Sequence, residues 1–141
     1  MSSLVWNDDY SVQITAIDNE HKLLVALINE FDITLQINAS FHSQIIIEKL
    51  GTLSRCIRSH FASEERFLLF NNYPEFDAHL SEHILLLDRL SSFESRFKVE
   101  KKAFNEKMLV FLMDWLIRHI ILHDRKFGSY FQDKELIERF G

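Results

Sequence analysis

Histidines and acidic residues recur along this chain at spacings that place them on the apolar sides of helical segments. His60 and Glu64 are four residues apart, as are His79 and His83, so each pair lies on one helix face. A polar group on an apolar face is costly to bury unless a partner compensates it. Five histidines and two carboxylates together therefore predict a bound metal. The predicted ligands are His21, His60, Glu64, His79, His83, His119 and Asp124.

The residue types and their number indicate a pair of metals. Imidazole nitrogen and carboxylate oxygen suit iron, zinc or manganese, and a structural zinc site takes only about four ligands. We expect one metal to bind the last three histidines of the set and the other to bind His21 and His60. If Glu64, Asp124 and a solvent-derived oxygen bridge the pair, the first metal is fully coordinated. The second metal then keeps one position open for a small ligand.

Asp124 is the least obvious member of the predicted set. It follows His119 by five residues, which on an ideal α-helix turns it about 140° away. His123, at four residues, is the natural helical partner of His119. Spacing alone favours His123, and Asp124 requires a local distortion or a long reach.

The elements that must position these residues are helices. The scarcity of chain breakers, three Gly and one Pro in 141 residues, predicts long helices with short connections. Apolar residues at helical offsets predict a first helix capped by Asp18, a second from about Phe41 to Phe70, a third that begins near Pro74 and a fourth that follows the charged loop 98–102. Gly51 within the second helix suggests a bend or a close packing contact.

This pattern predicts an all-α fold, an up-down-up-down antiparallel four-helix bundle that builds metal sites in its core. An irregular N-terminal arm (1–16) would precede the bundle, and a short C-terminal helical tail (129–141) would follow it. We expect residues 1–141 to form a single domain.

Composition excludes several classes of protein. The net charge of -5, with both signs interspersed, is not that of a nucleic-acid-binding surface. We expect no membrane partner, because no apolar stretch approaches the roughly 20 residues that span a bilayer. The N-terminus does not have the pattern of a signal peptide. The single cysteine, Cys56, excludes an intramolecular disulfide, and we expect a cytoplasmic protein.

Four stretches of the chain resemble the hemerythrin family, specifically its single-domain bacterial type. They are IDNEHK (17–22), HFASEE (60–65), YPEFDAHLSEH (73–83) and WLIRHIILHD (115–124). They occur in the family's order and fill all of its ligand positions. The family's last helix carries a histidine followed five residues later by an aspartate, so the resemblance selects Asp124 over His123. One departure is Glu20, where the family commonly has Gln.

The resemblance implies reversible binding of dioxygen, as a carrier, store or sensor and not as an enzyme. Its cofactor would be two non-haem iron ions with a bridging oxo or hydroxo group. Trp115 and Leu116 would line the oxygen pocket by their positions in the motif. His42 and His123 are extra to the motif, and we interpret Cys56 as a small buried hydrophobic residue.

Two alternatives use the same residues. The first is a di-iron enzyme acting on peroxide or nitric oxide, although the Glu-x-x-His pairs of ferritin-like oxidases are absent from the sequence. The second is an oxygen-responsive interaction module that signals to an unidentified protein partner. We expect the chain to be a monomer.

Overall fold

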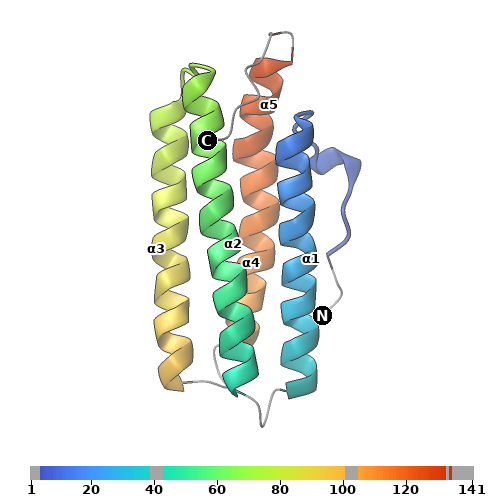
Figure 1. The fold of residues 1–141 in the computed structure, drawn as a ribbon, viewed down its shortest axis with the longest axis vertical. Coiled ribbons are helices and arrows are strands. Elements are labelled where there is room, and N and C mark those ends of the chain that lie inside the picture. The colour runs from blue at the N-terminus through green and yellow to red at the C-terminus, as the bar shows by residue number, and fades with distance from the viewer. Residues whose placement is uncertain (1–3, 39–42, 101–104, 133, 135–141) are drawn as a thin grey trace.

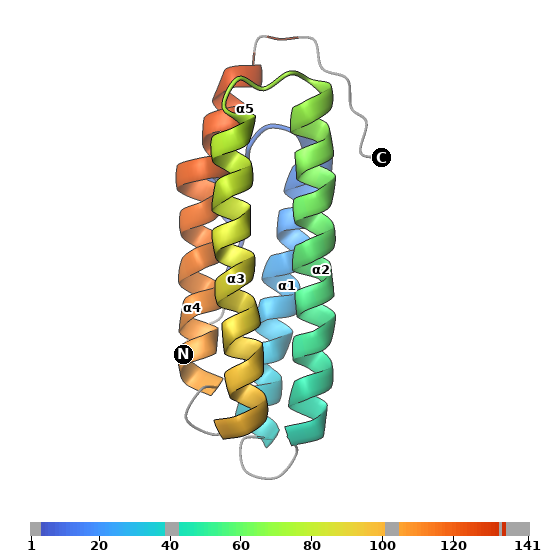
Figure 2. The ribbon, with the colours of Figure 1, turned by 90° about the vertical axis from the view of Figure 1, so that its left-hand side faces the viewer.

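The described residues of the computed structural model, 4–38, 43–100, 105–132 and 134, form four long antiparallel columns of helix (Figures 1 and 2). The first three columns are α1 (Thr15–Asn38), α2 (Ser43–Phe70) and α3 (Phe76–Glu100). The fourth is α4 (Asn105–Arg118), which continues through the π-helix η2 (His119–Asp124) into α5 (Arg125–Phe131). The predicted all-α bundle is confirmed. Most of its predicted C-terminal tail (129–141) lies outside the described residues, and α5 ends at Phe131.

Local chemistry explains where α2 ends. Asn72 has a φ of 54°, a left-handed conformation that Asn tolerates better than most residues. Its N–H bonds the Leu69 carbonyl at 3.2 Å, and the Tyr73 N–H bonds the Leu68 carbonyl at 3.0 Å. This is a Schellman motif, which satisfies carbonyls that the helix end leaves unpaired. It turns the chain tightly into α3.

The apolar interior is divided into two clusters. The larger, which we call the first core, includes Leu24, Phe61, Leu86 and Trp115. The second core comprises Val12, Ile14, Ile17, Phe67, Leu68, Tyr73, Phe127 and Phe131. Along each helical column the predicted ligands lie between residues of the first core and residues of the second core or, on α3, Phe76, which packs against the second core. The bundle therefore places them in one layer across its interior.

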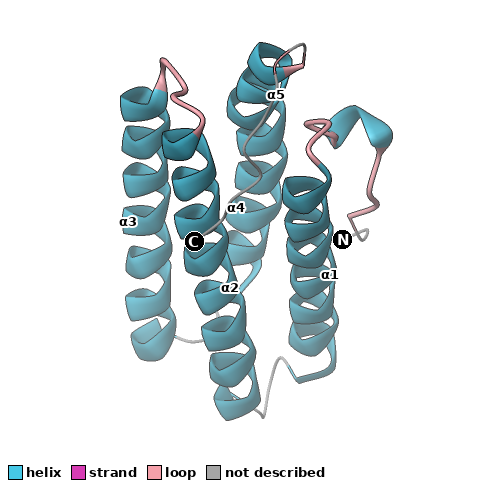
Figure 3. Cartoon of the chain, turned by 45° about the horizontal axis from the view of Figure 1, so that its top comes forward, coloured by secondary structure: helices cyan, strands magenta, loops and turns pink. Residues whose placement is uncertain are grey.

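The N-terminal arm runs alongside α1 and contains a 3-10 helix, η1 (Asp8–Tyr10) (Figure 3). Asp18 holds the arm, because its carboxylate accepts hydrogen bonds from the Val12 N–H at 2.8 Å and the Ser11 hydroxyl at 2.6 Å. The prediction that Asp18 caps the first helix is wrong, since α1 begins at Thr15. The Asp18 carboxylate therefore bonds the arm and does not cap the helix.

The close packing contact suggested for Gly51 is not found among the described residues, because a Cβ there would approach only the Arg55 guanidinium, at 3.4 Å. Close packing occurs instead at Gly128 of α5, which lies against the backbone of Val12. No helix in the described part of the chain is long and apolar enough to cross a membrane.

Candidate metal centre

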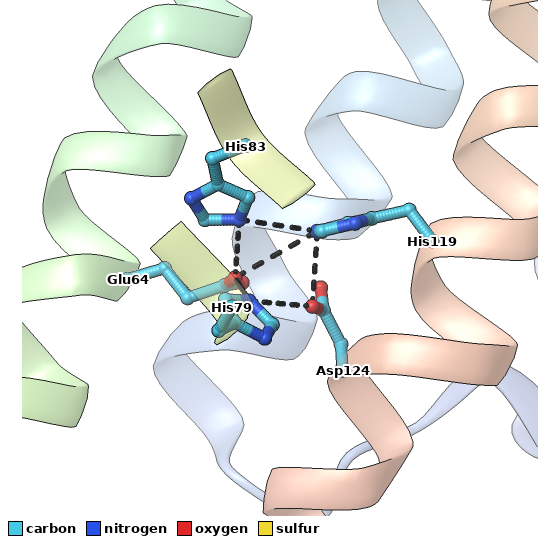
Figure 4. A group of neighbouring side chains, drawn as sticks. All are labelled: Glu64, His79, His83, His119 and Asp124. Atoms are coloured by element: carbon cyan, nitrogen blue, oxygen red, sulfur yellow. Dashed lines mark hydrogen bonds and ion pairs between the residues drawn. The ribbon is translucent and has the colours of Figure 1, made fainter. Parts of the chain in front are cut away.

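All seven predicted ligands are brought together in the layer between the two cores. α1 provides His21, α2 provides one histidine and Glu64, α3 provides two histidines, and η2 provides His119 and Asp124. Each is buried, and none has more than 5% of its surface exposed. Four separate helical columns therefore converge on one buried polar cluster, part of which is drawn in Figure 4.

The seven side chains fall into two groups that share their carboxylates. His79, His83 and His119 form one group with Glu64 and Asp124, and we call it the three-histidine group. His21 and His60 form the two-histidine group with the same two carboxylates. Within each group the ligating atoms lie within 4.8 Å of one another. This is the division of histidines that the sequence predicts for a metal pair.

Glu64 presents a different oxygen to each group. Its Oε1 lies 2.6 Å from His79 Nε2 and 3.0 Å from His83 Nε2. Its Oε2 lies 3.1 Å from Nε2 of His60 in the other group. A carboxylate oriented in this way is placed to bridge two cations.

Asp124 repeats the arrangement from the opposite side of the bundle. Its Oδ1 lies 3.0 Å from His119 Nε2 and 3.2 Å from His79 Nε2. Both contacts are drawn as dashed lines in Figure 4. Its Oδ2 lies 2.9 Å from His21 Nε2. Each carboxylate therefore gives one oxygen to the three-histidine group and the other oxygen to the two-histidine group.

The π-helix η2 explains how Asp124 reaches the site. A π-helix makes i→i+5 bonds and so has more residues per turn than an α-helix, which brings His119 and Asp124 toward the same side. His123 points elsewhere: its side chain is 39% exposed, and its Nε2 lies 3.4 Å from Glu82. The sequence contains no pattern for a π-helix except the five-residue spacing itself.

Charges are strongly coupled inside the cluster. Burial by itself lowers the pKa of His60, but Glu64 together with a hydrogen bond to Glu20 raises it to about 10. Burial likewise opposes the rise at His79, whose pKa reaches about 10 through Asp124 and Glu64. The pKa of His119 rises to about 9 for the same reason.

The two bridging carboxylates shift in the opposite direction. Burial would raise the pKa of Glu64, yet the surrounding histidines, His60 foremost, hold it well below its usual value. Burial and the charge of Glu64 would both raise the pKa of Asp124, and His119 and His21 nevertheless lower it. The carboxylates therefore stay ionised in a buried place, where they require nearby positive charge.

The unsatisfied atoms test whether metals fit this cluster. Among the described residues, His21 Nε2, His60 Nε2, Glu64 Oε2 and both Asp124 oxygens are buried without a hydrogen-bond partner of good geometry. Buried polar atoms are nearly always paired. Imidazole nitrogens and carboxylate oxygens are donors that bind first-row transition metals. The residues therefore fit a metal pair.

Two further carboxylates contact the Nδ1 atoms of two of the histidines, on the side of the ring away from Glu64. Glu20 Oε1 lies 2.6 Å from His60 Nδ1, and Glu65 Oε2 lies 2.6 Å from His83 Nδ1. Such contacts orient a metal-binding imidazole and select its tautomer. Glu20 stands out in the sequence as a departure from the family pattern, whereas Glu65 was not predicted and is marked only by its position next to Glu64.

Aromatic rings cover one side of the cluster. Phe61 stacks on His83 with a centroid separation of 3.8 Å. Trp115, the predicted pocket residue, lies 5.7 Å from Phe61 and stacks 5.9 Å from His119. The side chain of Leu116, the other predicted pocket residue, is outside the described part of the structure, as is His42. Cys56 is half-buried in the wall of a surface cavity.

Residues 12–130 match the family model described as the hemerythrin HHE cation binding domain. The chain belongs to the hemerythrin family. It is 34% identical over 122 residues to a bacteriohemerythrin of Pseudomonas aeruginosa, a match that covers 85% of this chain and 76% of that one. It is 28% identical over 123 residues to a hemerythrin of Phascolopsis gouldii, covering 87% and 89%.

Solved structures agree with this assignment. A crystal structure of a leucine-to-tyrosine variant of hemerythrin superposes with a TM-score of 0.81 at 25% identity. The match covers 92% of this chain and 97% of that one. The hemerythrin fold and the converging histidine and carboxylate cluster thus occur together in this chain.

Proposed function

We propose that this hemerythrin-family protein binds dioxygen reversibly at a non-haem di-iron centre. The observation that carries the proposal is the orientation of Glu64 and Asp124, each of which gives one oxygen to the three-histidine group and one to the two-histidine group. Family membership supports iron as the metal and dioxygen as the ligand.

Each residue of the cluster has a role in this proposal. One iron would be held by the three-histidine group and the other by the two-histidine group. Glu64, Asp124 and an oxo or hydroxo group would bridge them. The iron pair would supply the electrons that dioxygen accepts when it binds. Because the two-histidine group offers one ligand fewer, we place the open coordination position there.

The surroundings suit reversible binding. The ligands lie between two apolar cores, and the rings of Phe61 and Trp115 exclude water from their side of the cluster. A low-dielectric surrounding disfavours the release of a charged species from the site. We propose that Trp115 and Leu116 line the pocket for the ligand.

We propose a binding protein and not an enzyme. Five imidazoles and two carboxylates make a donor set poorer in anionic oxygen than the carboxylate-rich di-iron sites of ferritin-like proteins. Neutral donors stabilise high metal charge less than anions do, which disfavours cleavage of the O–O bond. We expect no sustained turnover of peroxide or nitric oxide with a reductant. We further propose that the protein is a cytoplasmic monomer.

Metal analysis combined with absorbance spectra tests the function directly. The expected result is about two irons per chain, with visible charge-transfer bands that form in air and disappear on deoxygenation. An iron-loaded protein that stays colourless and unchanged in air would refute dioxygen binding. Steady consumption of peroxide or nitric oxide would favour the enzymatic alternative.

A further inference from the structure

Each histidine group of the candidate centre has one carboxylate behind it that belongs to neither group. Glu20 contacts Nδ1 of His60, and Glu65 contacts Nδ1 of His83, both at 2.6 Å. A neutral imidazole carries a single N–H, so donation from Nδ1 leaves Nε2 free to bind a metal. In both histidines Nε2 is the nitrogen that faces Glu64. The two outer carboxylates therefore select the tautomer that ligation requires.

Glu20 is itself held in place. Its second oxygen, Oε2, accepts a hydrogen bond of 2.9 Å from the hydroxyl of Ser63, which is buried on α2. A chain of contacts thus runs from Ser63 through Glu20 of α1 to His60 on α2. The Glu20 side chain has limited freedom to turn away from the imidazole, although a third of it is exposed.

We propose that Glu20 is a positioning residue that tunes the metal of the two-histidine group, while Glu65 tunes the metal of the three-histidine group. This inference rests on the proposed di-iron function. A negative charge behind an imidazole makes it a stronger donor. A stronger donor favours the more highly charged metal, so Glu20 lowers the reduction potential at the position where we place the dioxygen ligand.

The charge of Glu20 is separable from its hydrogen bond. A glutamine at position 20 would keep an oxygen to accept the His60 Nδ1–H and would remove only the negative charge. An alanine would remove both. Glu20 also lines a surface cavity of about 150 Å³ together with Leu23 and Cys56. Shortening its side chain enlarges an existing opening and leaves no void in the core, so the variants are expected to fold.

Zinc titration provides a probe that is independent of oxygen chemistry. Isothermal titration of the metal-free protein with Zn²⁺ should show two sites in the wild type. Glu20→Ala should weaken one of them by about 10–100-fold, the usual effect of removing such a support, and leave the other unchanged. Glu65→Ala should weaken the other, and the double variant should weaken both. A Glu20→Ala protein with both wild-type affinities would overturn the proposal.

Two measurements distinguish positioning from a general structural effect. In the Zn²⁺-loaded protein, the nitrogen-bound proton of His60 Nδ1 should remain visible by NMR in Glu20→Gln and be lost in Glu20→Ala. In the iron-loaded protein, Glu20→Gln should raise the reduction potential of the centre, whereas an unchanged potential would overturn the tuning role. A wild type that fails to bind two metals would refute the proposed function itself, and variants identical to a competent wild type would refute only this inference.

Discussion

Replacing Gly128 with alanine tests the contact between the N-terminal arm and the end of the fourth column. A Cβ on Gly128 would lie 2.5 Å from the Val12 carbonyl oxygen and 3.1 Å from the Val12 Cα. An ordinary contact needs about 3.4 Å, so the arm or α5 must move by about 0.9 Å. The obstructing atoms belong to the backbone and cannot rotate away. Val12 is moreover held by its bond to Asp18.

The cost follows from two opposing effects. Overpacking a rigid site destabilises by up to about 3 kcal/mol, and alanine stabilises a helix by about 1 kcal/mol relative to glycine. The net loss is up to about 2 kcal/mol, which lowers the melting temperature of a domain this size by up to about 6 °C. Gly51→Ala is the matched control, because its Cβ would meet only the flexible Arg55 side chain. That variant should gain about 1 kcal/mol.

Thermal unfolding followed by circular dichroism would measure both variants in the metal-free and metal-loaded protein. Gly128 lies four residues after Asp124, so a displaced α5 should also weaken metal binding, whereas Gly51→Ala should leave it unchanged. The reasoning fails if Gly128→Ala is as stable as the wild type, because the arm would then not be seated on α5.

Further outcomes follow from the cluster. His119→Ala and Asp124→Ala should each lose bound iron while His123→Ala retains it, by metal analysis; loss in His123→Ala alone would overturn the ligand set. In the metal-free protein the pKa values of His60 and His79 are raised from 6.5 to about 10. Their stabilising contribution is therefore complete below pH 6.5 and lost as pH rises through about 10, so the urea midpoint should fall between pH 7 and 10; a rising midpoint would contradict the shifts. Metal loading at pH 7 should release protons from these histidines, seen as a dependence of titration enthalpy on the buffer; equal enthalpies in all buffers would exclude it.

The sequence could predict the parts of this structure that depend on periodicity. The shared faces of His60 with Glu64 and of His79 with His83 follow from helical spacing, and the second helix ends at Phe70 as predicted. Those spacings also place the polar groups at one level of the helices, where a helix bundle buries them together.

Features that depend on tertiary contacts could not be predicted from helical periodicity. Spacing alone favoured His123, because that spacing assumes an α-helix of 3.6 residues per turn, whereas residues 119–124 form a π-helix. Asp18 has the residue type of a helix cap, yet the arm uses its carboxylate. Glu65 follows the predicted ligand Glu64 in the sequence, and only the position of α3 reveals that it contacts His83.

The division of the interior into two cores has a consequence for cooperativity. The layer of ligands separates the two apolar cores along the bundle, so each core on its own buries less apolar surface than one continuous core would. In the metal-free state the layer contains mutually attracting charges, and no coordinate bond joins the helices across it. The second core relies on the arm and α5, and its amides should exchange hydrogen first. We expect bound metal to link the two cores, so that they unfold in a single cooperative transition.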